Sequence, residues 1–223
     1  MTTFTFVRHG QTDWNFQKRI QGSTDNPLND TGREQARETG LALAERMRLA
    51  RESGAVSGDE ALFSGIVASP LSRARETAEI IAGIVGLGAP ELVDALVERS
   101  YGEAEGLDAA ALAARFPDPL APVPGRERRR HVVARVLPAL EALAEEHPGE
   151  SLIVVAHGGV IGSLIRYVTE KKLPGKGHAI PNGSAHDFLL DDGHLSIAEF
   201  NGEAIPTTIR SRAPLALELT PPS

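Results

Sequence analysis

The chain has 223 residues, is 41% hydrophobic and carries a formal net charge of −7. This composition fits one domain with a substantial core and disfavours sequence-independent binding of nucleic acid. The chain has no cysteine, which excludes disulfides and thiolate metal sites and is compatible with a reducing cytoplasm. No apolar run is long enough to span a membrane, and no signal-peptide pattern precedes the first strand. We therefore expect one cytoplasmic domain over residues 1–223 that binds neither a membrane nor nucleic acid.

The first predicted strand covers residues 4–7, and Arg8, His9 and Gly10 follow it directly. Ligands in open α/β sheets bind beyond the carboxyl ends of strands, so this turn is the expected place for chemistry. The Arg8 guanidinium offers a planar set of donors that matches phosphate or carboxylate, and His9 is the one nucleophile of the three. Gly10 permits a tight turn and is expected to let an anion approach the main chain.

Strands and helices alternate along the rest of the chain. After a polar loop at 9–30, the capping-box spacing of Thr31 and Glu34 predicts a helix from about residue 32 to 51. The pattern then predicts a flexible connection at 52–62, a strand at 65–69, a helix from Pro70 to about 85, a strand at 90–93, a loop at 96–107, a short helix and a proline-rich crossing at 108–125, a helix at 127–147, a strand at 151–156, a helix at 158–170, a hairpin of strands at 185–190 and 194–200, and an irregular tail at about 210–223.

This alternation predicts the α/β class, as a three-layer α/β/α sandwich with a mostly parallel sheet. A short cap-like insertion is expected at about residues 99–127. A second histidine follows the most apolar strand, where His157 precedes Gly158. Two strands that both end in His-Gly predict that the imidazoles of His9 and His157 converge on one pocket. The histidines without such a context are expected on the surface: His131, His147, His178, His186 and His194.

From Val7 to about Leu189, the chain resembles the histidine phosphatase superfamily, which includes the cofactor-dependent phosphoglycerate mutases. No single matching segment is specific, but their order along the chain is. The matching segments are residues 8–15 (Arg-His-Gly-Gln-Thr-Asp-Trp-Asn), 21–22 (Gln-Gly), 69–74 (Ser-Pro-Leu-Ser-Arg-Ala), Glu98 with 102–106, 124–125 (Pro-Gly), 156–159 (Ala-His-Gly-Gly) and 182–184 (Asn-Gly-Ser).

The resemblance implies a role for each of these residues. His9 resembles the nucleophile that becomes phosphohistidine, and Glu98 resembles the general acid that later acts as base. The implied cationic pocket around the transferring phosphoryl group consists of Arg8, Arg73 and His157. The implied contacts to phosphate and substrate also include Asn15, Gln21, Gly22 and Gly158.

Two assignments stay open. Glu103 and Glu105 are rivals of Glu98 for the acid role, or neighbours that would raise its pKa. The run of Arg126, Arg128, Arg129 and Arg130 is typical of an exposed helix face. However, cations at a helix start oppose the dipole, and the preceding proline-rich segment should cover the pocket. A second anion-binding role for one of these arginines is therefore the alternative.

The favoured function is a phosphomonoesterase that acts on small phosphorylated metabolites without a metal or a cofactor. A phosphoglycerate mutase is the first alternative, but a mutase must exclude water from phosphohistidine, and the segment between Leu107 and Pro124 is short for that purpose. A non-catalytic module that binds phosphorylated ligands is the second. The third is a zinc hydrolase with His9, His157 and Glu98 as ligands, which the neighbouring arginines disfavour. The substrate and the oligomeric state stay open, a homodimer included.

Overall fold

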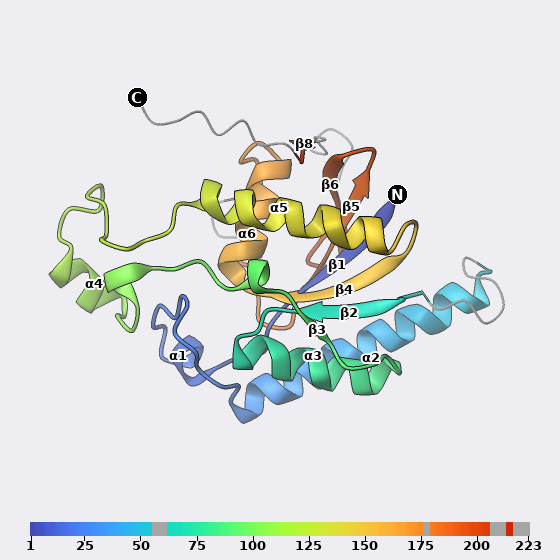
Figure 1. The fold of residues 1–223 in the computed structure, drawn as a ribbon. Coiled ribbons are helices and arrows are strands. Elements are labelled where there is room, and N and C mark those ends of the chain that lie inside the picture. Colours follow the sequence, from blue (N-terminus) through green and yellow to red (C-terminus); the bar gives the residue numbers. More distant parts are fainter. Residues whose placement is uncertain (55–61, 176–178, 206–212, 216–223) are drawn as a thin grey trace.

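The structure is a computed structural model that describes residues 1–54, 62–175, 179–205 and 213–215. It has three layers, because a central sheet lies between helices on its two faces (Figure 1). The expected α/β/α class is therefore confirmed. The predicted connection at 52–62, His178 and the predicted tail at 210–223 lie wholly or largely outside the described residues.

The sheet combines a parallel centre with an antiparallel extension. Its strands are Thr2–Arg8 (β1), Gly65–Ala68 (β2), Glu91–Leu92 (β3), Ser151–Ala156 (β4), Ala185–Asp191 (β5), His194–Phe200 (β6), Glu203–Ala204 (β7) and Ala213–Pro214 (β8). Their order is β3-β2-β4-β1-β5-β6-β7, with β8 paired to β6. The strands β3, β2, β4 and β1 are parallel, and the expected hairpin is confirmed as β5 and β6.

The helices follow the expected order along the chain. They are Asp13–Phe16 (α1), Asp30–Glu52 (α2), Ser72–Val85 (α3), Ala109–Arg115 (α4), Arg129–Glu146 (α5) and Gly158–Val168 (α6), with 3-10 turns at Asp94–Leu96 and Gly102–Ala104. None of the helices in the described part of the chain has the length and apolar character that crossing a membrane requires.

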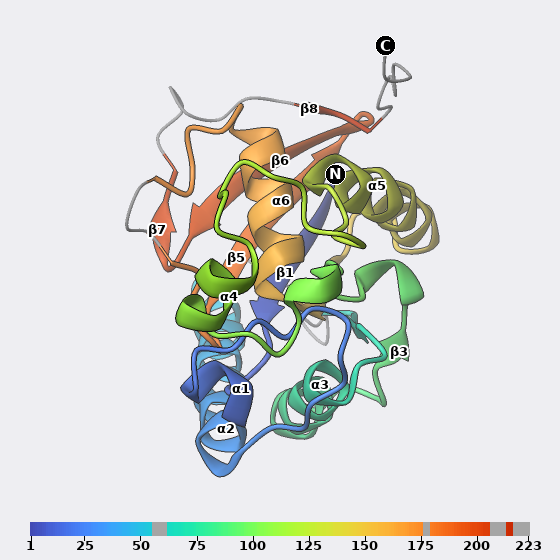
Figure 2. The same cartoon turned by 90° about the vertical axis from the view of Figure 1, so that its left-hand side faces the viewer.

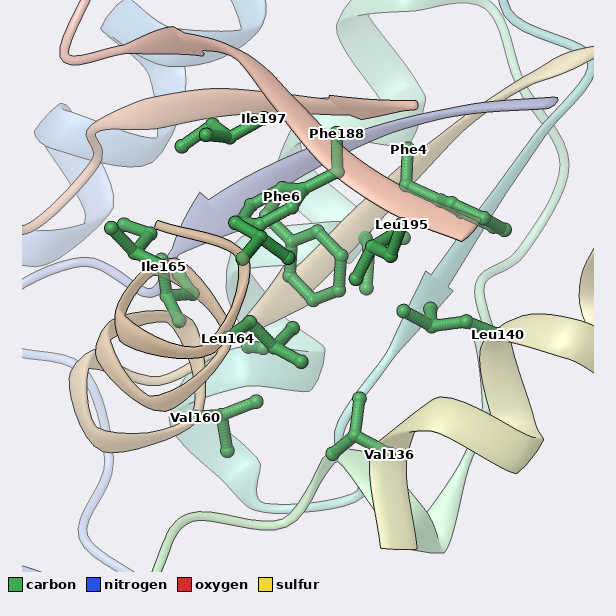
Figure 3. Close-up of a cluster of buried hydrophobic side chains, with 14 of the residues drawn as sticks. Phe4, Phe6, Val136, Leu140, Val160, Leu164, Ile165, Phe188, Leu195 and Ile197 are labelled. Atoms are coloured by element: carbon green, nitrogen blue, oxygen red, sulfur yellow. The ribbon is translucent and has the colours of Figure 1, made fainter. Parts of the chain in front are cut away.

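Each face of the sheet has its own core. On one face, Phe4, Phe6 and Phe188 are buried against α5 and α6 (Figure 3). On the other face, Val7 is buried with aliphatic and alanine side chains of α2 and α3. Successive side chains of a strand point to opposite faces, which explains why neighbouring residues of β1 enter different cores.

The register of the parallel strands sets the positions of the two histidines. In the pairing of β1 with β4, Arg8 lies opposite Ala156, and each is the last residue of its strand. His9 and His157 therefore leave the sheet at the same edge. On the other side of β4, β2 ends at Ala68, which brings the start of α3 to that edge as well.

The start of α2 differs from the expected one. The helix begins at Asp30, because the side chain of Asn29 accepts a hydrogen bond from the Gly32 N–H at 2.9 Å. Asn29 is therefore the N-cap, and the expected capping box of Thr31 and Glu34 is wrong. Both positions offer capping side chains in the sequence, so the choice between them depends on how the preceding loop enters the helix.

Other boundaries lie within two residues of the expected ones. Pro70 lies before α3 rather than in its first turn, because Leu71 is extended (φ −62°, ψ 135°) and is the N-cap. The loop expected at 9–30 contains the single helical turn α1, and the loop expected at 96–107 overlaps the two 3-10 turns. Short local hydrogen bonds, which leave no periodic pattern in the sequence, form these turns.

The surface position expected for His186 is wrong. This residue of β5 is fully buried and its ring stacks on Phe200, with the centroids 5.2 Å apart. Its Nε2 lies 2.9 Å from Ser184 Oγ, and its Nδ1 accepts the Asn201 N–H at 3.3 Å. Burial lowers the pKa of His186 to about 4, so the ring is a neutral part of the core. The other described histidines expected on the surface are His131, which is exposed, and His147 and His194, which are half-buried.

Candidate active site

A pocket of about 360 Å³ opens at the edge where β1, β2 and β4 end. The residues that follow these strands form one wall, and α6 with the first turn of α5 forms another. His157 is fully buried and does not line the pocket. The other expected site residues all line it: Arg8, His9, Asn15, Gln21, Gly22, Arg73, Glu98 and Gly158.

Main-chain atoms fix the orientation of His9. Its Nδ1 lies 2.6 Å from the Gly10 carbonyl oxygen, and its own N–H donates to Ala156 O at 3.0 Å. A carbonyl oxygen only accepts, so Nδ1 carries the proton and Nε2 keeps the lone pair. Burial, and then the charges of Arg73 and Arg8, hold the pKa of His9 well below its ordinary value. The neutral imidazole that results is the form able to attack phosphorus.

Gly10 serves helix packing rather than anion binding. A Cβ at this position would lie 2.2 Å from the carbonyl oxygen of Gly32 at the start of α2. The Gly10 N–H already donates to Thr77 Oγ1 at 3.1 Å. The expectation that an anion approaches the main chain here is therefore wrong. The close approach of the two glycines instead fixes the loop of the nucleophile against α2.

His157 faces His9 edge to face, with the ring centroids 5.1 Å apart. Its Nε2 lies 2.8 Å from Ser69 Oγ, which also accepts the Leu71 N–H at 3.3 Å, so the hydroxyl proton is directed at Nε2. The ring proton then lies on Nδ1. Burial, and then the charge of Arg73, hold the pKa of His157 well below its ordinary value. The expected convergence of the two imidazoles is thus present, with both rings neutral.

Three buried nitrogens around His9 have no hydrogen-bond partner among the described residues. They are Nε of Arg8, Nε of Arg73 and Nδ1 of His157. The Nη1 of Arg8 is anchored on Ile180 O. Leaving a buried donor unpaired costs about 1–3 kcal/mol, and more for a charged group. Three such donors beside one imidazole form a cradle for an anion with several acceptor oxygens, such as a phosphoryl group.

Arg73 is fully buried and is positioned by a loop that Glu105 holds. Its Nη1 donates to Thr24 O at 2.9 Å and its Nη2 to Gly22 O at 2.8 Å. The Glu105 carboxylate accepts hydrogen bonds from the N–H and hydroxyl groups of Ser23 and Thr24 at 2.6–3.2 Å. Burial raises the pKa of Glu105, but these hydrogen bonds outweigh burial and lower it overall. Glu105 is therefore an ionised anchor.

Glu98 supplies the one carboxylate among the described residues that line the pocket. Its Oε1 accepts the Arg99 N–H at 2.7 Å, and its Oε2 accepts the Gly159 N–H at 2.9 Å. Burial raises the pKa of Glu98, and the two N–H groups with Arg73 and Arg8 oppose this rise without cancelling it. A carboxyl group that keeps its proton to higher pH is suited to act as a general acid.

Asn15 and Gln21 line the pocket from the polar loop. Asn15 Oδ1 accepts hydrogen bonds from the N–H of Thr12 and from Nδ2 of Asn182, both at 3.2 Å. Gln21 Oε1 accepts the Thr12 hydroxyl at 2.8 Å. The amide oxygens are thus occupied, which leaves the NH₂ groups to donate to a ligand. Asn182 also donates to the carbonyl oxygen of His9 at 2.9 Å and so ties this loop to the nucleophile.

The pattern of the histidine phosphatase superfamily (branch 1) matches residues 4–203, a range that includes every site residue described above. The chain belongs to the histidine phosphatase superfamily. The expected family is thereby confirmed, and with it the assignment of the chain to a superfamily of phosphatases and phosphoglycerate mutases.

Members of this superfamily with both kinds of activity are similar to the chain. The phosphatase PhoE of Bacillus subtilis, named as uncharacterized, is 38% identical over 171 residues, which cover 76% of this chain and 78% of PhoE. A 2,3-bisphosphoglycerate-dependent phosphoglycerate mutase of Parvibaculum lavamentivorans is 33% identical over 172 residues, which cover 71% of this chain and 76% of the mutase. The structure of a mycobacterial glucosyl-3-phosphoglycerate phosphatase with VO3 aligns at a TM-score of 0.73 and 27% identity, over 90% of this chain and 99% of that one.

In this member of the superfamily, the two rivals of Glu98 have other partners. Glu103 is exposed and forms an ion pair with Arg115 of α4 at 2.6 Å. Glu105 holds the loop that positions Arg73, as described above. Neither carboxylate lines the pocket. Of the three, Glu98 is the one placed to exchange a proton with a bound ligand.

The insertion contributes less to the pocket than expected. Helix α4 belongs to this insertion (Figure 2), but no residue between Tyr101 and Arg129 lines the pocket. The proline-rich segment was expected to cover the pocket. This expectation is wrong in that none of its residues lines the pocket. Of the arginine run, Arg129 alone lines the pocket, while the guanidinium of Arg126 stacks on the Tyr101 ring at 5.7 Å. Arg128, Arg129 and Arg130 are all exposed.

Several residues of the site were not assigned from the sequence, among them Arg166 and three others with clear structural roles. Ser69 orients His157, Asn182 joins the loop of Asn15 to the nucleophile, and Tyr101 forms part of the pocket wall. Ser69 and Asn182 lie in segments that carry the resemblance to the superfamily, which was a usable signal for both. Tyr101 lies in a segment that the pattern assigns to a loop, and although residues 98–102 resemble the mutases, the sequence assigns Tyr101 no role.

The described residues contain no group of three or more histidine, aspartate or glutamate side chains arranged to hold a metal ion. The zinc alternative would need His9, His157 and Glu98 as ligands, but Arg8 and Arg73 place positive charge beside all three. The donor set fits an anion rather than a cation.

Proposed function

We propose that this protein is a phosphomonoesterase that hydrolyses small phosphorylated metabolites through a phosphohistidine on His9. One observation carries the proposal. The neutral ring of His9 is fixed by Gly10 O with its Nε2 lone pair available, inside a cradle of three unpartnered donors. A phosphoryl group satisfies those donors and presents its phosphorus to the nucleophile.

In the first step, His9 Nε2 attacks phosphorus, the bond to the ester oxygen breaks, and Glu98 transfers its proton to the departing oxygen. Arg8, Arg73 and His157 donate hydrogen bonds to the non-bridging oxygens, while Gly10 O stabilises the charge that forms on the imidazole. In the second step, the Glu98 carboxylate takes a proton from water, the water oxygen attacks phosphorus, and the bond from phosphorus to Nε2 breaks. Inorganic phosphate leaves, and His9 and Glu98 return to their starting states.

The proposed chemistry needs neither a metal ion nor a cofactor, because arginine and histidine donors supply the positive charge. Activity is therefore expected to persist in a chelator such as EDTA. The proposed location is the cytoplasm, which the absence of cysteine allows. Cell fractionation tests this location independently of activity.

The decisive experiment is to trap the intermediate. Brief incubation with a ³²P-labelled monoester and an alkaline quench should leave label on His9, in an adduct that acid removes. His9→Ala should abolish labelling and turnover, whereas His131→Ala, a change at an exposed histidine, should retain both. An adduct stable to acid and labile to base, or label on His157, would refute the mechanism. A folded protein that binds phosphorylated ligands without labelling or turnover would favour the non-catalytic module.

A mutase is the runner-up, since curated mutases are similar to the chain. Against it, no residue between Tyr101 and Arg129 lines the pocket, so the insertion does not enclose the phosphohistidine. Water-driven release of phosphate from several monoesters, without a bisphosphorylated activator, is the expected result. Efficient interconversion of 2- and 3-phosphoglycerate with little release of phosphate would reverse the preference.

A further inference from the structure

The pocket continues beyond the phosphoryl cradle, and two further arginines line this outer part. Arg129 comes from the first turn of α5, and Arg166 from the last turn of α6. Among the described residues, no carboxylate lies within ion-pair distance of either guanidinium. The pocket lining also includes small or aliphatic residues: Ile20, Gly162, Pro174, Ala179 and Ile180.

The charges of the lining residues do not balance around a single phosphoryl group. Arg8 and Arg73 match the two negative charges of a phosphomonoester, and Glu98 is neutral when it acts as the acid. Arg129 and Arg166 then remain uncompensated. The chain has 30 acidic and 23 basic side chains, so carboxylates are abundant elsewhere on it. Arginines without an ion pair among the described residues also occur outside the pocket, for example Arg19, Arg51, Arg128 and Arg130. What distinguishes Arg129 and Arg166 is that both line the pocket that contains the phosphoryl cradle.

Arg129 is held in place over α6. Its Nη1 donates to Ser163 Oγ at 3.4 Å, and a Cβ on Gly162 would lie 3.7 Å from the same nitrogen. The missing side chain at Gly162 leaves room for the guanidinium above the helix. Burial, and then the charge of Arg99, lower the pKa of Arg129, and the charge of Arg166 acts in the same direction. A bound anion would relieve this repulsion.

The rise of helix α6 along the pocket wall allows distances between lining residues to be estimated. Gly158, Gly162 and Arg166 are spaced four residues apart and all line the pocket. A Cβ on Gly158 would lie 3.3 Å from Nε of Arg8, which places this residue at the level of the cradle. At 1.5 Å per residue, the level of Arg129 over Gly162 is about 6 Å further along the helix, and Arg166 is about 12 Å away.

We propose that Arg129 and Arg166 bind a second anionic group of the substrate. The preferred substrates are then small phosphomonoesters with a carboxylate or a second phosphate roughly 6–12 Å from the reacting phosphorus, joined to it by a short, largely apolar linker. This assignment rests on the proposed phosphatase function and names its substrate class. The volume of about 360 Å³ restricts that class to small molecules.

The test uses a homologous series of ω-phosphooxy carboxylic acids, the matching uncharged amides, and the bisphosphates of the corresponding diols. Release of inorganic phosphate gives kcat/KM for each ester. The esters with a carboxylate or a second phosphate are expected to exceed the amides by roughly 10- to 100-fold at the best chain length, because charged hydrogen bonds are gained. Added salt should reduce this advantage. The series with the higher kcat/KM, carboxylic acids or bisphosphates, identifies the second anion.

Two variants locate the effect. Arg129→Met keeps the length of the side chain and should remove most of the advantage of the anionic esters, with a much smaller loss on p-nitrophenyl phosphate, which has no second anion. Arg130→Met is the matched control, since this exposed neighbour does not line the pocket, and it should retain the advantage. The comparison of acids with amides uses the wild type alone, so it stands even if a variant fails to fold.

The outcomes separate this inference from the phosphatase proposal. If p-nitrophenyl phosphate is hydrolysed through His9 but neither the acids nor the bisphosphates react faster than the amides at any chain length, the second-anion subsite is refuted and the phosphatase stands. An equal loss in Arg129→Met and Arg130→Met also refutes it. If the wild type hydrolyses none of the esters, the phosphatase proposal fails and this inference fails with it.

Discussion

The replacement Glu98→Gln tests the general acid with little change of shape. In the structure, each carboxylate oxygen of Glu98 accepts a main-chain N–H, one from Arg99 and one from Gly159. Glutamine has one carbonyl oxygen and one NH₂ group, so one of these two N–H groups would face another donor. Leaving a donor of this kind unpaired costs about 1–3 kcal/mol, which is less than the stability of an ordinary domain. The variant is therefore expected to fold with a reduced unfolding free energy.

The catalytic effect should depend on the leaving group. Proton transfer by a positioned acid contributes about 10²- to 10⁴-fold, and a glutamine cannot exchange its protons in this way. For an alkyl phosphate, whose alkoxide needs a proton, kcat/KM should fall by that factor. For p-nitrophenyl phosphate, whose phenolate leaves unaided, the fall should be much smaller. Rates on both esters, measured for wild type, Glu98→Gln and Glu103→Gln, make the comparison, and the exposed Glu103 is the control.

The pH profile gives a second readout. Glu98 must be protonated for the first step, so activity falls as the pH rises through its pKa, which burial raises above the ordinary value. His9 must be neutral, and its pKa lies well below the ordinary value because of burial and the neighbouring arginines, so activity persists to low pH. Glu98→Gln should remove the alkaline fall on poor leaving groups.

Glu105→Gln should raise KM by loosening the loop that holds Arg73, without changing the dependence on the leaving group. The assignment of the acid would be refuted by a specific pattern of results. If the dependence on the leaving group steepens in Glu103→Gln or Glu105→Gln and not in Glu98→Gln, the acid is one of the other two carboxylates.

Three further substitutions test other parts of the structure. In the wild type, the His186 ring is protonated near pH 6.5 in the unfolded chain but only near pH 4 in the folded protein. The unfolding free energy therefore falls by roughly 3 kcal/mol as the pH is lowered from 6.5 to 4. His186→Phe should make this fall smaller. Urea denaturation at several pH values measures this loss, and equal losses in both proteins would contradict the prediction. Ser69→Ala leaves Nε2 of His157 without its partner and should lower kcat/KM about 10-fold on good and poor leaving groups alike, and unchanged kinetics would count against the role of Ser69. Gly22→Ala forces a side chain onto a φ of +59° and 2.0 Å from Glu105 Oε1, so thermal unfolding should show a lower Tm and steady-state kinetics a higher KM, and a protein identical to wild type would disprove the contact.

The sheet and its two histidines could be predicted because their signals are local. An apolar strand followed by His-Gly is visible at both His9 and His157, and parallel pairing places such ends at one edge. The start of α2 could not be predicted in the same way, since Asn29 and Thr31 both carry capping side chains. The burial of His186 depends on Phe200 and Asn201 across the hairpin, and the sequence around His186 does not indicate these contacts.

The site residues expected from the resemblance to the superfamily lie together around the pocket. The alternative candidates, such as Glu105 in place of Glu98, could be excluded only from the structure. Glu98 and Glu105 look alike in sequence. They differ because Gly159, 61 positions away, donates to one, while Ser23 and Thr24 donate to the other. Which arginine of the run lines the pocket depends on where α5 begins and on the space above Gly162, and neither is a property of the run itself.

The anchoring of the site by main-chain atoms has a consequence for how such a protein diversifies. Peptide carbonyls and N–H groups persist whichever side chain a position carries, so mutation at Thr24, Arg99 or Ile180 does not by itself remove the anchoring hydrogen bond. The anchoring positions Gly10, Gly22 and Gly159 are restricted to glycine, because a Cβ there would lie 2.0–2.5 Å from a neighbouring atom. Residues of the outer wall of the pocket do not anchor the reacting groups, so they can be replaced without displacing those groups. Lineages that descend from one ancestor can thus exchange one metabolite for another while inheriting the same phosphoryl chemistry. The main-chain anchors are Gly10 O for His9, Ile180 O for Arg8, the carbonyl oxygens of Gly22 and Thr24 for Arg73, and the N–H groups of Arg99 and Gly159 for Glu98.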